Sequence, residues 1–169
     1  MHCPSDCKAN NRGVLIELSG QGCRELEIIL NAQKRTWLSF LKDCVFFGAK
    51  FPRVDFAIDD RRTYFNIPDL YKKLENGEAI SKFRSIEYNG SLRIDNGSPG
   101  GMSIYFGSKK SEVYMVFYEK NYEQAKKFNT PLEDIGLWNR YEVRLMNERA
   151  ENAIYELLDR GDLMYVSKS

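Results

Sequence analysis

Alternating apolar and polar residues predict strands along much of the chain. The clearest strand follows a turn at residues 107–111, where Val113, Met115 and Phe117 form one apolar face. The residues of its other face are mostly polar: Glu112, Tyr114, Val116, Tyr118 and Lys120. Two phenols, a carboxylate and an amine are costly to bury without partners, so this face is the first place to look for chemistry.

Five more strands are predicted, at residues 13–18, 51–60, 83–88, 102–106 and 137–146, with the same alternation in 51–60 and 137–146. The turn at 107–111 joins two of the strands into a hairpin. Residues 89–101 are rich in Gly, Ser and Asn and are expected to form a long flexible connection without a regular pattern.

Apolar residues at helical spacing predict the helices. One begins near Cys23, and a second follows a cap at Thr36 and ends at residues 46–48. Three more are expected at residues 66–75, 121–128 and 148–160: Asn66 and Asn121 are the predicted caps of the first two, and Gly161 stops the last. The predicted fold class is α+β, with an antiparallel or mixed sheet of about six strands and helices packed mainly on one side.

Length and charge suggest one domain. The chain has 169 residues and a formal net charge of +1, which suits a single core and excludes a strongly basic nucleic-acid coat protein. We expect a disordered leader at 1–12, one domain at 13–162 and a tail at 163–169. No apolar run approaches the roughly 20 residues of a membrane span, and the N-terminus is polar, so a cytoplasmic location is expected.

Cysteine and histidine offer little for catalysis or metal binding. Cys3 and Cys7 lie in the leader beside His2, the only histidine, and a single such pair is a weak zinc signal. Cys23 and Cys44 fall in helical patterns and are expected to be buried thiols. Phosphate-loop, nucleophile-elbow and Rossmann motifs are absent from the sequence. An enzyme with this sequence would depend on carboxylates, tyrosines, lysines and arginines.

Acidic residues on one predicted strand suggest a metal site. Asp55 and Asp59 share a strand face, from which their side chains can converge on a divalent cation with a third acid from a neighbouring strand. The alternatives are a solvated ladder of charges, or Asp59 and Asp60 capping the next turn.

Five motifs occur in order along the chain, and together they resemble one family. They are Ser19-Gly20-Gln21-Gly22-Cys23-Arg24, Arg53-Val54-Asp55-Phe56-Ala57-Ile58-Asp59-Asp60, Tyr105-Phe106-Gly107-Ser108-Lys109-Lys110-Ser111, Phe117-Tyr118-Glu119-Lys120-Asn121 and Arg140-Tyr141-Glu142-Val143-Arg144-Leu145. The sequence resembles the replication initiation factor family, which comprises rolling-circle plasmid initiators and relaxases of conjugative transposons in Gram-positive bacteria. The resemblance runs from residue 13 to residue 158.

The resemblance implies nicking of single-stranded origin DNA by a tyrosine hydroxyl, leaving a 5′-phosphotyrosine link and a free 3′-hydroxyl. It points to Tyr118 as the nucleophile, and the strand alternation agrees. Tyr141 is the rival nucleophile and Tyr114 a more distant one. The expected partners are single-stranded or supercoiled origin DNA, a helicase and a second copy of the chain.

The implied chemistry also assigns supporting residues. Mg²⁺ or Mn²⁺ is the expected cofactor. Its expected ligands are Asp55, Asp59 and Glu142. Lys120 and Arg140 are expected to contact phosphates; alternatively, Arg140 and Glu142 pair with charges across the sheet. The expected DNA-binding residues are Lys109, Lys110 and Arg53. The basic pairs Lys109-Lys110, Arg61-Arg62 and Lys126-Lys127 are alternatively solvated surface.

The sequence departs from the family pattern at one position and in its length. Family members often carry an arginine two residues before the nucleophile, where this chain has Val116. The chain is also short and starts close to its first predicted strand, so a catalytic-domain fragment or a truncated form is expected. The alternative functions are a non-catalytic DNA-binding remnant of the family and a plain interaction domain.

Overall fold

The structure is a computed structural model that describes residues 14–161. Its contacts divide the chain into two compact units, Met1–Phe47 and Gly48–Ser169. The predicted leader, the predicted tail, Cys3, Cys7 and His2 lie outside the described residues, and the predicted domain limits stay a prediction. No helix in the described part of the chain is long and apolar enough to cross a membrane.

The first unit contains two capped helices. Helix α1 spans Gly20–Ala32, and the Ser19 side chain accepts a hydrogen bond from the backbone of its first turn. Helix α2 spans Trp37–Phe46, with Thr36 and Ser39 forming a reciprocal capping box. The cap predicted at Thr36 is therefore confirmed.

Two predictions for the first unit were wrong. Residues 14–18 form no strand, although their sequence is rich in apolar, strand-forming residues, because they pair with no neighbouring strand. Val14 and Leu15 of this segment are largely exposed. The thiols of Cys23 and Cys44 are half-buried rather than buried.

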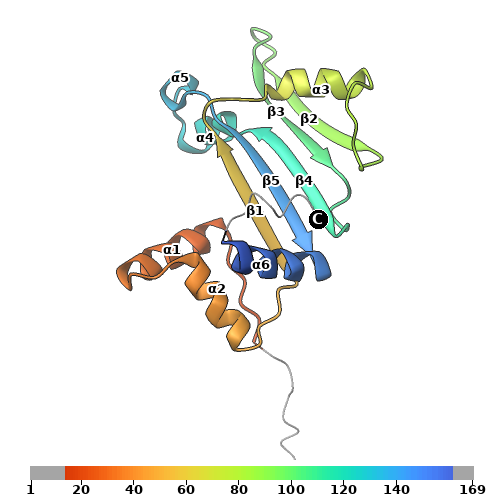
Figure 1. The fold of residues 1–169 in the computed structure, drawn as a ribbon. Coiled ribbons are helices and arrows are strands. Elements are labelled where there is room, and N and C mark those ends of the chain that lie inside the picture. The colour runs from red at the N-terminus through yellow and green to blue at the C-terminus, as the bar shows by residue number, and fades with distance from the viewer. Residues whose placement is uncertain (1–13, 162–169) are drawn as a thin grey trace, which may run out of the picture. The chain divides into compact units, whose positions relative to one another are not determined.

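The second unit is built on one antiparallel sheet with the strand order β1-β5-β4-β3-β2 (Figure 1). Its strands are β1 (Arg53–Asp60), β2 (Ile86–Leu92), β3 (Pro99–Phe106), β4 (Val113–Glu119) and β5 (Asn139–Met146). Its helices are α3 (Ile67–Glu75), α4 (Lys120–Phe128), α5 (Leu132–Ile135) and α6 (Glu148–Arg160). The predicted α+β class is confirmed, with five strands in the described residues because 14–18 adds none.

Strand alternation separates an apolar face from a polar face of this sheet. Ile104 and Phe106 of β3 pack with α3 in one core cluster, and Leu145 of β5 packs with α6 in another. Both helices therefore cover the apolar face. The antiparallel register places Val113, Met115 and Phe117 opposite Leu145, Val143 and Tyr141 on that face. The polar side chains of β1, β4 and β5 consequently share the other face.

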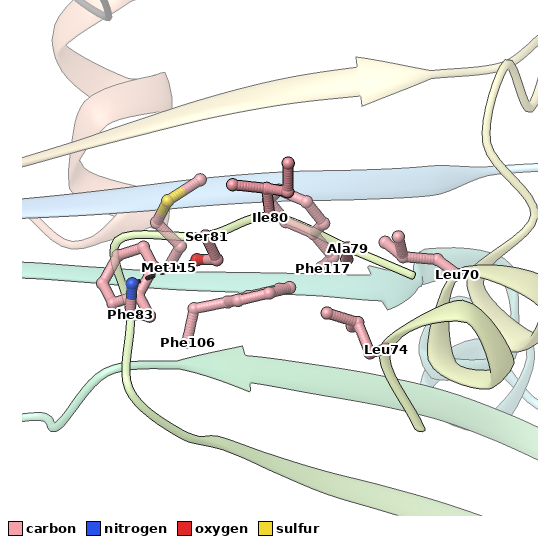
Figure 2. Close-up of a pocket in the computed structure, with 9 residues that line it drawn as sticks. All are labelled: Leu70, Leu74, Ala79, Ile80, Ser81, Phe83, Phe106, Met115 and Phe117. Carbon is pink, nitrogen blue, oxygen red and sulfur yellow. Dashed lines mark hydrogen bonds between the residues drawn. The ribbon is translucent and has the colours of Figure 1, made fainter. Parts of the chain in front are cut away.

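The apolar face also holds a cavity of about 220 Å³ between α3 and the sheet (Figure 2). It is lined by apolar side chains of α3, β3, β4 and the segment before β2, with Ser81 the polar exception. The cavity therefore lies away from the polar face.

The segment at residues 89–101 is more regular than predicted. Strand β2 continues to Leu92 and β3 begins at Pro99, and the two strands pair with a register shift between Gly90 and Leu92. Repeated Gly, Ser and Asn residues mask this hairpin in the sequence, since they are common in connections. The Gly101 backbone has a φ of +98°, and a Cβ there would lie 2.8 Å from Tyr122 Cβ, so this position favours glycine.

Candidate functional site

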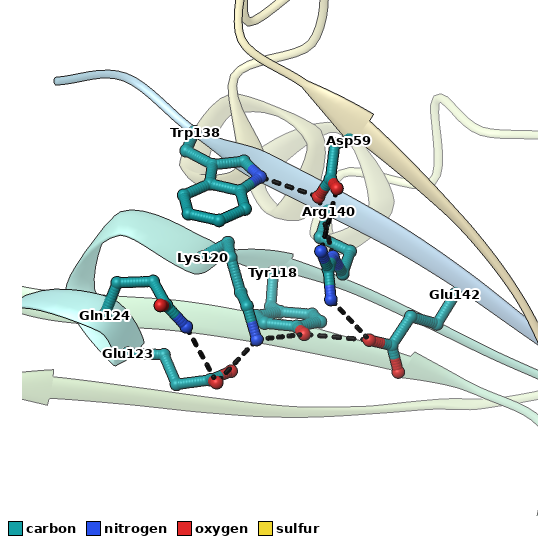
Figure 3. A network of polar contacts seen from close by, with 8 residues as sticks. All are labelled: Asp59, Tyr118, Lys120, Glu123, Gln124, Trp138, Arg140 and Glu142. Carbon is teal, nitrogen blue, oxygen red and sulfur yellow. Dashed lines mark hydrogen bonds and ion pairs between the residues drawn. The ribbon is translucent and has the colours of Figure 1, made fainter. Parts of the chain in front are cut away.

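Tyr118 lies near the end of β4 on the polar face of the sheet. The register places it opposite Arg140 of β5, and Glu142 lies two residues further along the same strand. The Tyr118 hydroxyl donates a 2.8 Å hydrogen bond to Glu142 Oε1 (Figure 3). A phenol is thus paired with a carboxylate that is positioned to accept its proton.

Lys120 reaches the same hydroxyl from a helix. It is the first residue of α4, and Lys120 Nζ donates to Tyr118 Oη at 3.3 Å and to Glu123 Oε1 at 2.5 Å. Only 10% of its side chain is exposed. The sequence pattern placed Lys120 on the strand and Asn121 at the helix cap, but the strand ends at Glu119, which is the N-cap. The predicted cap was therefore wrong, whereas the predicted neighbourhood of Lys120 and Tyr118 is present.

Arg140 forms a two-point ion pair with Asp59 across strands β1 and β5. Its Nε and Nη2 atoms lie 2.6 and 2.8 Å from the two Asp59 oxygens, and its Nη1 lies 3.9 Å from Glu142 Oε1. The Trp138 indole also donates to Asp59, at 2.6 Å. Figure 3 shows these contacts joining Asp59, Arg140, Glu142 and Tyr118 into one polar network.

The network shifts the pKa values of its members in opposite directions. Burial, followed by the hydrogen bond to Glu142, raises the pKa of the Tyr118 phenol well above its ordinary value. The hydrogen bond from Arg140 is the main cause that lowers the pKa of Asp59. Asp59 in turn raises the pKa of Arg140. The site therefore holds a protonated phenol beside a firmly charged arginine.

The three carboxylates predicted as metal ligands do not gather around one point. Asp55 lies four residues from Asp59 on β1, about 13 Å along a strand. Asp55 instead pairs with Arg53 at 2.6 Å and with Arg144 at 3.4 Å. Within residues 14–161, no group of three His, Cys, Asp or Glu side chains is placed to hold a metal ion. The residues present therefore do not fit the predicted three-carboxylate site.

The rival tyrosines lie in different surroundings. Tyr141 is on the apolar face, packs edge-on against Phe117 and donates to Asp60 at 2.9 Å. Burial and this hydrogen bond raise its pKa to about 12. Tyr114 is buried, with the Arg144 guanidinium 5.6 Å from its ring centre. The surroundings of both phenols thus differ from those of Tyr118, which lies between a lysine and a carboxylate.

The basic residues predicted to bind DNA lie at the other end of the sheet. Lys109 and Lys110 are exposed in the β3–β4 turn, and Arg53 starts β1, opposite Met146 at the end of β5. About five residues of β4, roughly 17 Å, separate this end from Tyr118. Val116, which stands where family members often have arginine, lies opposite Glu142 on the polar face.

Sequence reasoning missed Glu123 and Trp138 as members of the site. Glu123 follows Lys120 by three residues, a spacing that brings side chains together on a helix, so a helix start at Lys120 would have revealed it. Trp138 precedes β5 and joins the site through its hydrogen bond to Asp59 on another strand. The sequence alone does not show this contact.

Comparisons with known proteins agree with the predicted resemblance. Residues 49–169 match the family model described as Replication initiation factor, and residues 2–43 match that of the Rolling Circle replication initiation protein N-terminal domain. The protein named "Putative DNA relaxase NicK" of Bacillus subtilis (strain 168) is 58% identical over 158 residues, which cover 94% of this chain and 45% of that protein.

A solved structure has a similar fold. The "Structure of Rolling Circle Replication Initiator Protein from Geobacillus stearothermophilus" matches with a TM-score of 0.67 and 28% identity, covering 84% of this chain and 50% of that chain. The chain thus spans about half the length of these relatives. Because the family model matches most of the chain, the chain belongs to the replication initiation factor family.

Proposed function

We propose that this chain nicks one strand of origin DNA and transfers it through a covalent bond to Tyr118, at the start of rolling-circle replication or conjugative transfer. Family membership supports the substrate class. The single observation that carries the mechanism is the Tyr118 hydroxyl, which contacts a carboxylate at 2.8 Å and an ammonium group at 3.3 Å.

In the proposed reaction, Tyr118 Oη forms a bond to the phosphorus of the scissile phosphodiester. The bond from that phosphorus to the 3′ oxygen of the preceding nucleotide breaks, and this oxygen leaves as a hydroxyl after taking a proton from solvent. Glu142 accepts the phenol proton, which is needed because the phenol pKa is raised in this site. The product is a 5′-phosphotyrosine and a free 3′-hydroxyl.

Lys120 and Arg140 supply positive charge to the phosphate in this proposal. The Lys120 ammonium lies beside the attacking oxygen, and its burial strengthens its attraction for an anion. Asp59 binds Nε and Nη2 of Arg140 and so holds the guanidinium in place before DNA arrives, which leaves Nη1 to contact a phosphate oxygen. Both cations are already paired with carboxylates, so a bound phosphate shares them with Asp59 and Glu123.

Dependence on Mg²⁺ or Mn²⁺ is a further part of the proposal. A divalent cation stabilises charge that develops on a phosphate during transfer. Of the three predicted ligands, Glu142 contacts the Tyr118 hydroxyl and Asp59 contacts Arg140, whereas Asp55 belongs to a separate ion-pair cluster. The proposed reaction therefore assigns no step to the cation.

The decisive experiment incubates the protein with a single-stranded origin oligonucleotide and Mg²⁺, and measures protein–DNA adducts that survive denaturing electrophoresis. Wild-type protein and the Tyr155→Phe control, which changes an exposed tyrosine of α6, should form the adduct, and Tyr118→Phe should not. An adduct that persists in Tyr118→Phe and disappears in Tyr141→Phe would reassign the nucleophile. Nicking that continues unchanged in EDTA would reject the proposed dependence on Mg²⁺ or Mn²⁺.

The location of Val116 supports a second function, a DNA-binding remnant without catalysis. Val116 lies opposite Glu142, so a phosphate contact expected of the family is missing beside the proposed base. Under this alternative, wild-type protein binds the oligonucleotide without forming an adduct, and Val116→Arg restores adduct formation. An adduct with wild-type protein rejects the alternative.

The remaining proposals concern the whole protein, because the chain covers 45% of its Bacillus relative. We propose supercoiled origin DNA as the natural substrate, a helicase and a second copy of the chain as partners, and the cytoplasm as the compartment. Lys109, Lys110 and Arg53 are proposed to contact DNA away from the nick.

A further inference from the structure

We propose that Trp138, together with Arg61, forms a stacking site for a base of the single DNA strand next to the scissile phosphate. The stacking site deepens the proposed nicking function and rests on it. It concerns how the DNA strand is positioned, since Trp138 takes no part in forming or breaking the phosphodiester bond.

The Trp138 ring is fixed beside the proposed phosphate-binding arginine. Its Nε1 donates to Asp59 Oδ1 at 2.6 Å, and the same carboxylate holds the Arg140 guanidinium. The Arg140 Cζ atom lies 5.6 Å from the centre of the Trp138 ring. A base stacked on this ring would therefore lie next to a phosphate bound by Arg140, which is opposite Tyr118 (Figure 3).

Arg61 stacks on the indole and adds positive charge. Its Cζ atom is 3.5 Å from the ring centre, and its Nη1 donates to the carbonyl of Ile135 at 3.5 Å. Indole rings and guanidinium planes are both surfaces on which unpaired bases stack. Arg61 thus covers one face of the indole, so the base stacks on the outer side of the guanidinium or on the opposite face of the ring, and Arg61 attracts the DNA backbone.

The two segments that carry this pair expose further apolar and basic groups. Tyr64, Phe65 and Leu137 are 72%, 59% and 64% exposed. Arg62 is exposed and donates to the Tyr64 hydroxyl at 3.1 Å. Exposed aromatic side chains mixed with arginines are typical of surfaces that bind single strands without reading their sequence.

A purely structural role for Trp138 makes a different prediction. In that role the indole N–H only holds Asp59, and its ring meets no base. Trp138→Phe keeps an aromatic ring and removes the N–H, whereas Trp138→Ala removes both. Base stacking predicts that Trp138→Phe retains most of the DNA affinity. If the indole N–H only holds Asp59, the two variants should lose the same amount of DNA affinity.

Fluorescence provides a direct test, because the chain contains two tryptophans. A Trp37→Phe/Tyr118→Phe protein leaves Trp138 as the sole tryptophan and prevents attachment of DNA. Adding the single-stranded origin oligonucleotide should quench its emission. Repeating the titration with abasic positions moved along the oligonucleotide should remove the quenching at one position beside the nick.

Binding measurements complete the test in the full chain carrying Tyr118→Phe. Trp138→Ala should raise the Kd for the oligonucleotide about 5- to 150-fold, the effect of removing one base–aromatic stack. Phe128→Ala is the matched control, because Phe128 is a 63% exposed aromatic residue with Lys127 5.3 Å from its ring centre. It should leave the Kd unchanged.

Three outcomes would overturn the proposal: no quenching of Trp138, quenching that is insensitive to abasic positions, or equal losses in Trp138→Phe and Trp138→Ala. Circular dichroism of each variant identifies misfolding, and the quenching test needs no change at Trp138. Failure of the nicking function is distinguishable, because it appears as a missing adduct in the wild-type protein while the quenching persists.

Discussion

The phenol of Tyr118 is held in its protonated form, which determines how the site has to work. Burial and the neighbouring Glu142 carboxylate both disfavour a phenolate. On the proposed mechanism, the proton therefore has to leave the phenol as the bond to phosphorus forms. Glu142 Oε1, at 2.8 Å from the hydroxyl, is placed to accept it.

Replacing Glu142 by glutamine should lower the nicking rate at neutral pH by about 10²- to 10⁴-fold, the usual contribution of a general base. Oligonucleotide affinity should change little. The rate that remains should rise with pH, because only the phenolate fraction then reacts. Nicking rates measured between about pH 6 and 9 test this.

Glu112→Gln is the matched control for Glu142→Gln, since Glu112 is exposed and precedes the same strand β4. It should nick like the wild type. A Glu142→Gln rate that is equal to the wild-type rate and independent of pH would contradict the assigned base.

The Asp59 carboxylate should make stability sensitive to acid. Its folded pKa is lowered mainly by Arg140, so its contribution is present above the unfolded pKa, near 3.9, and is lost as pH falls through the lower folded value. The free energy of unfolding should therefore fall below about pH 4, and less steeply in Asp59→Asn. Urea titrations at several pH values measure the free energy of unfolding. An equally steep dependence on pH in the wild type and in Asp59→Asn would contradict the prediction.

At the scale of elements, the junction between β4 and α4 brings the proposed nucleophile and its lysine together. The strand ends at Glu119 and the helix begins at the next residue, so no loop separates Tyr118 from Lys120. The Glu119 carboxylate accepts a hydrogen bond from the Met102 backbone at 2.9 Å, which fixes the junction against β3. The geometry of the site thus depends on how closely α4 approaches β3.

Gly101→Ala should disturb that approach. A Cβ at this position would lie 2.8 Å from Tyr122 of α4, and the backbone φ of +98° is itself strained for alanine. We expect a loss of stability of about 1–3 kcal/mol and a slower nicking rate. Thermal unfolding and adduct formation measure the two effects.

Gly90→Ala is the comparison for Gly101→Ala, because it lies on the neighbouring strand β2 and its Cβ would meet only Met102 Cε, at 3.6 Å. Its stability loss should be clearly smaller. Similar losses in both variants would mean that the close approach to Tyr122 is unimportant.

Local patterns predicted those elements that carry their own signals. The Thr36 and Asn66 caps, the stop at Gly161 and the alternation in β4 and β5 all depend on nearby residues, and the structure contains them. A strand also needs a neighbour, which is why the apolar run at residues 14–18 does not form one. The β2–β3 hairpin was missed because its residues have a weak propensity for strands. Pairing between the two strands overrides that propensity.

The site could be predicted only where contacts follow from one strand or from the family resemblance. Tyr118 and Lys120 are close in sequence, and Arg140 and Glu142 share one face of β5. The position of Asp59 beside Arg140 depends on the register between β1 and β5, which no local pattern specifies. The same register separates Asp55 from this group, and therefore the predicted three-carboxylate set did not assemble.

At the scale of the whole molecule, the chain consists of two compact units that meet near Phe47 and Gly48 in sequence. Phe46 and Phe47 are 82% and 81% exposed, and Gly48 has a φ of +76°. Limited digestion with chymotrypsin should therefore cut first at these phenylalanines. Mass spectrometry of the early products tests this, and a first cut within the sheet would contradict it.

The proposed DNA contacts at the far end of the sheet should appear in the salt dependence of binding. Lys109→Ala/Lys110→Ala should weaken oligonucleotide binding and lower the slope of log K against log salt by about 1.4, since each neutralised phosphate of a single strand contributes about 0.7. Lys72→Ala/Lys73→Ala removes two lysines from α3, which covers the apolar face, and should leave the slope unchanged. An unchanged slope in the first variant would remove these lysines from the DNA path.

The strand order has a mechanical consequence for a protein joined covalently to DNA. On the proposed mechanism, any pull on the attached DNA acts first on Tyr118. Strand β4, which carries this residue, is bonded to β3 on one side and to β5 on the other. Tension from a moving replication or transfer machine would be shared by two hydrogen-bonded ladders, so the anchor should resist tearing better than a tyrosine on an edge strand or a loop.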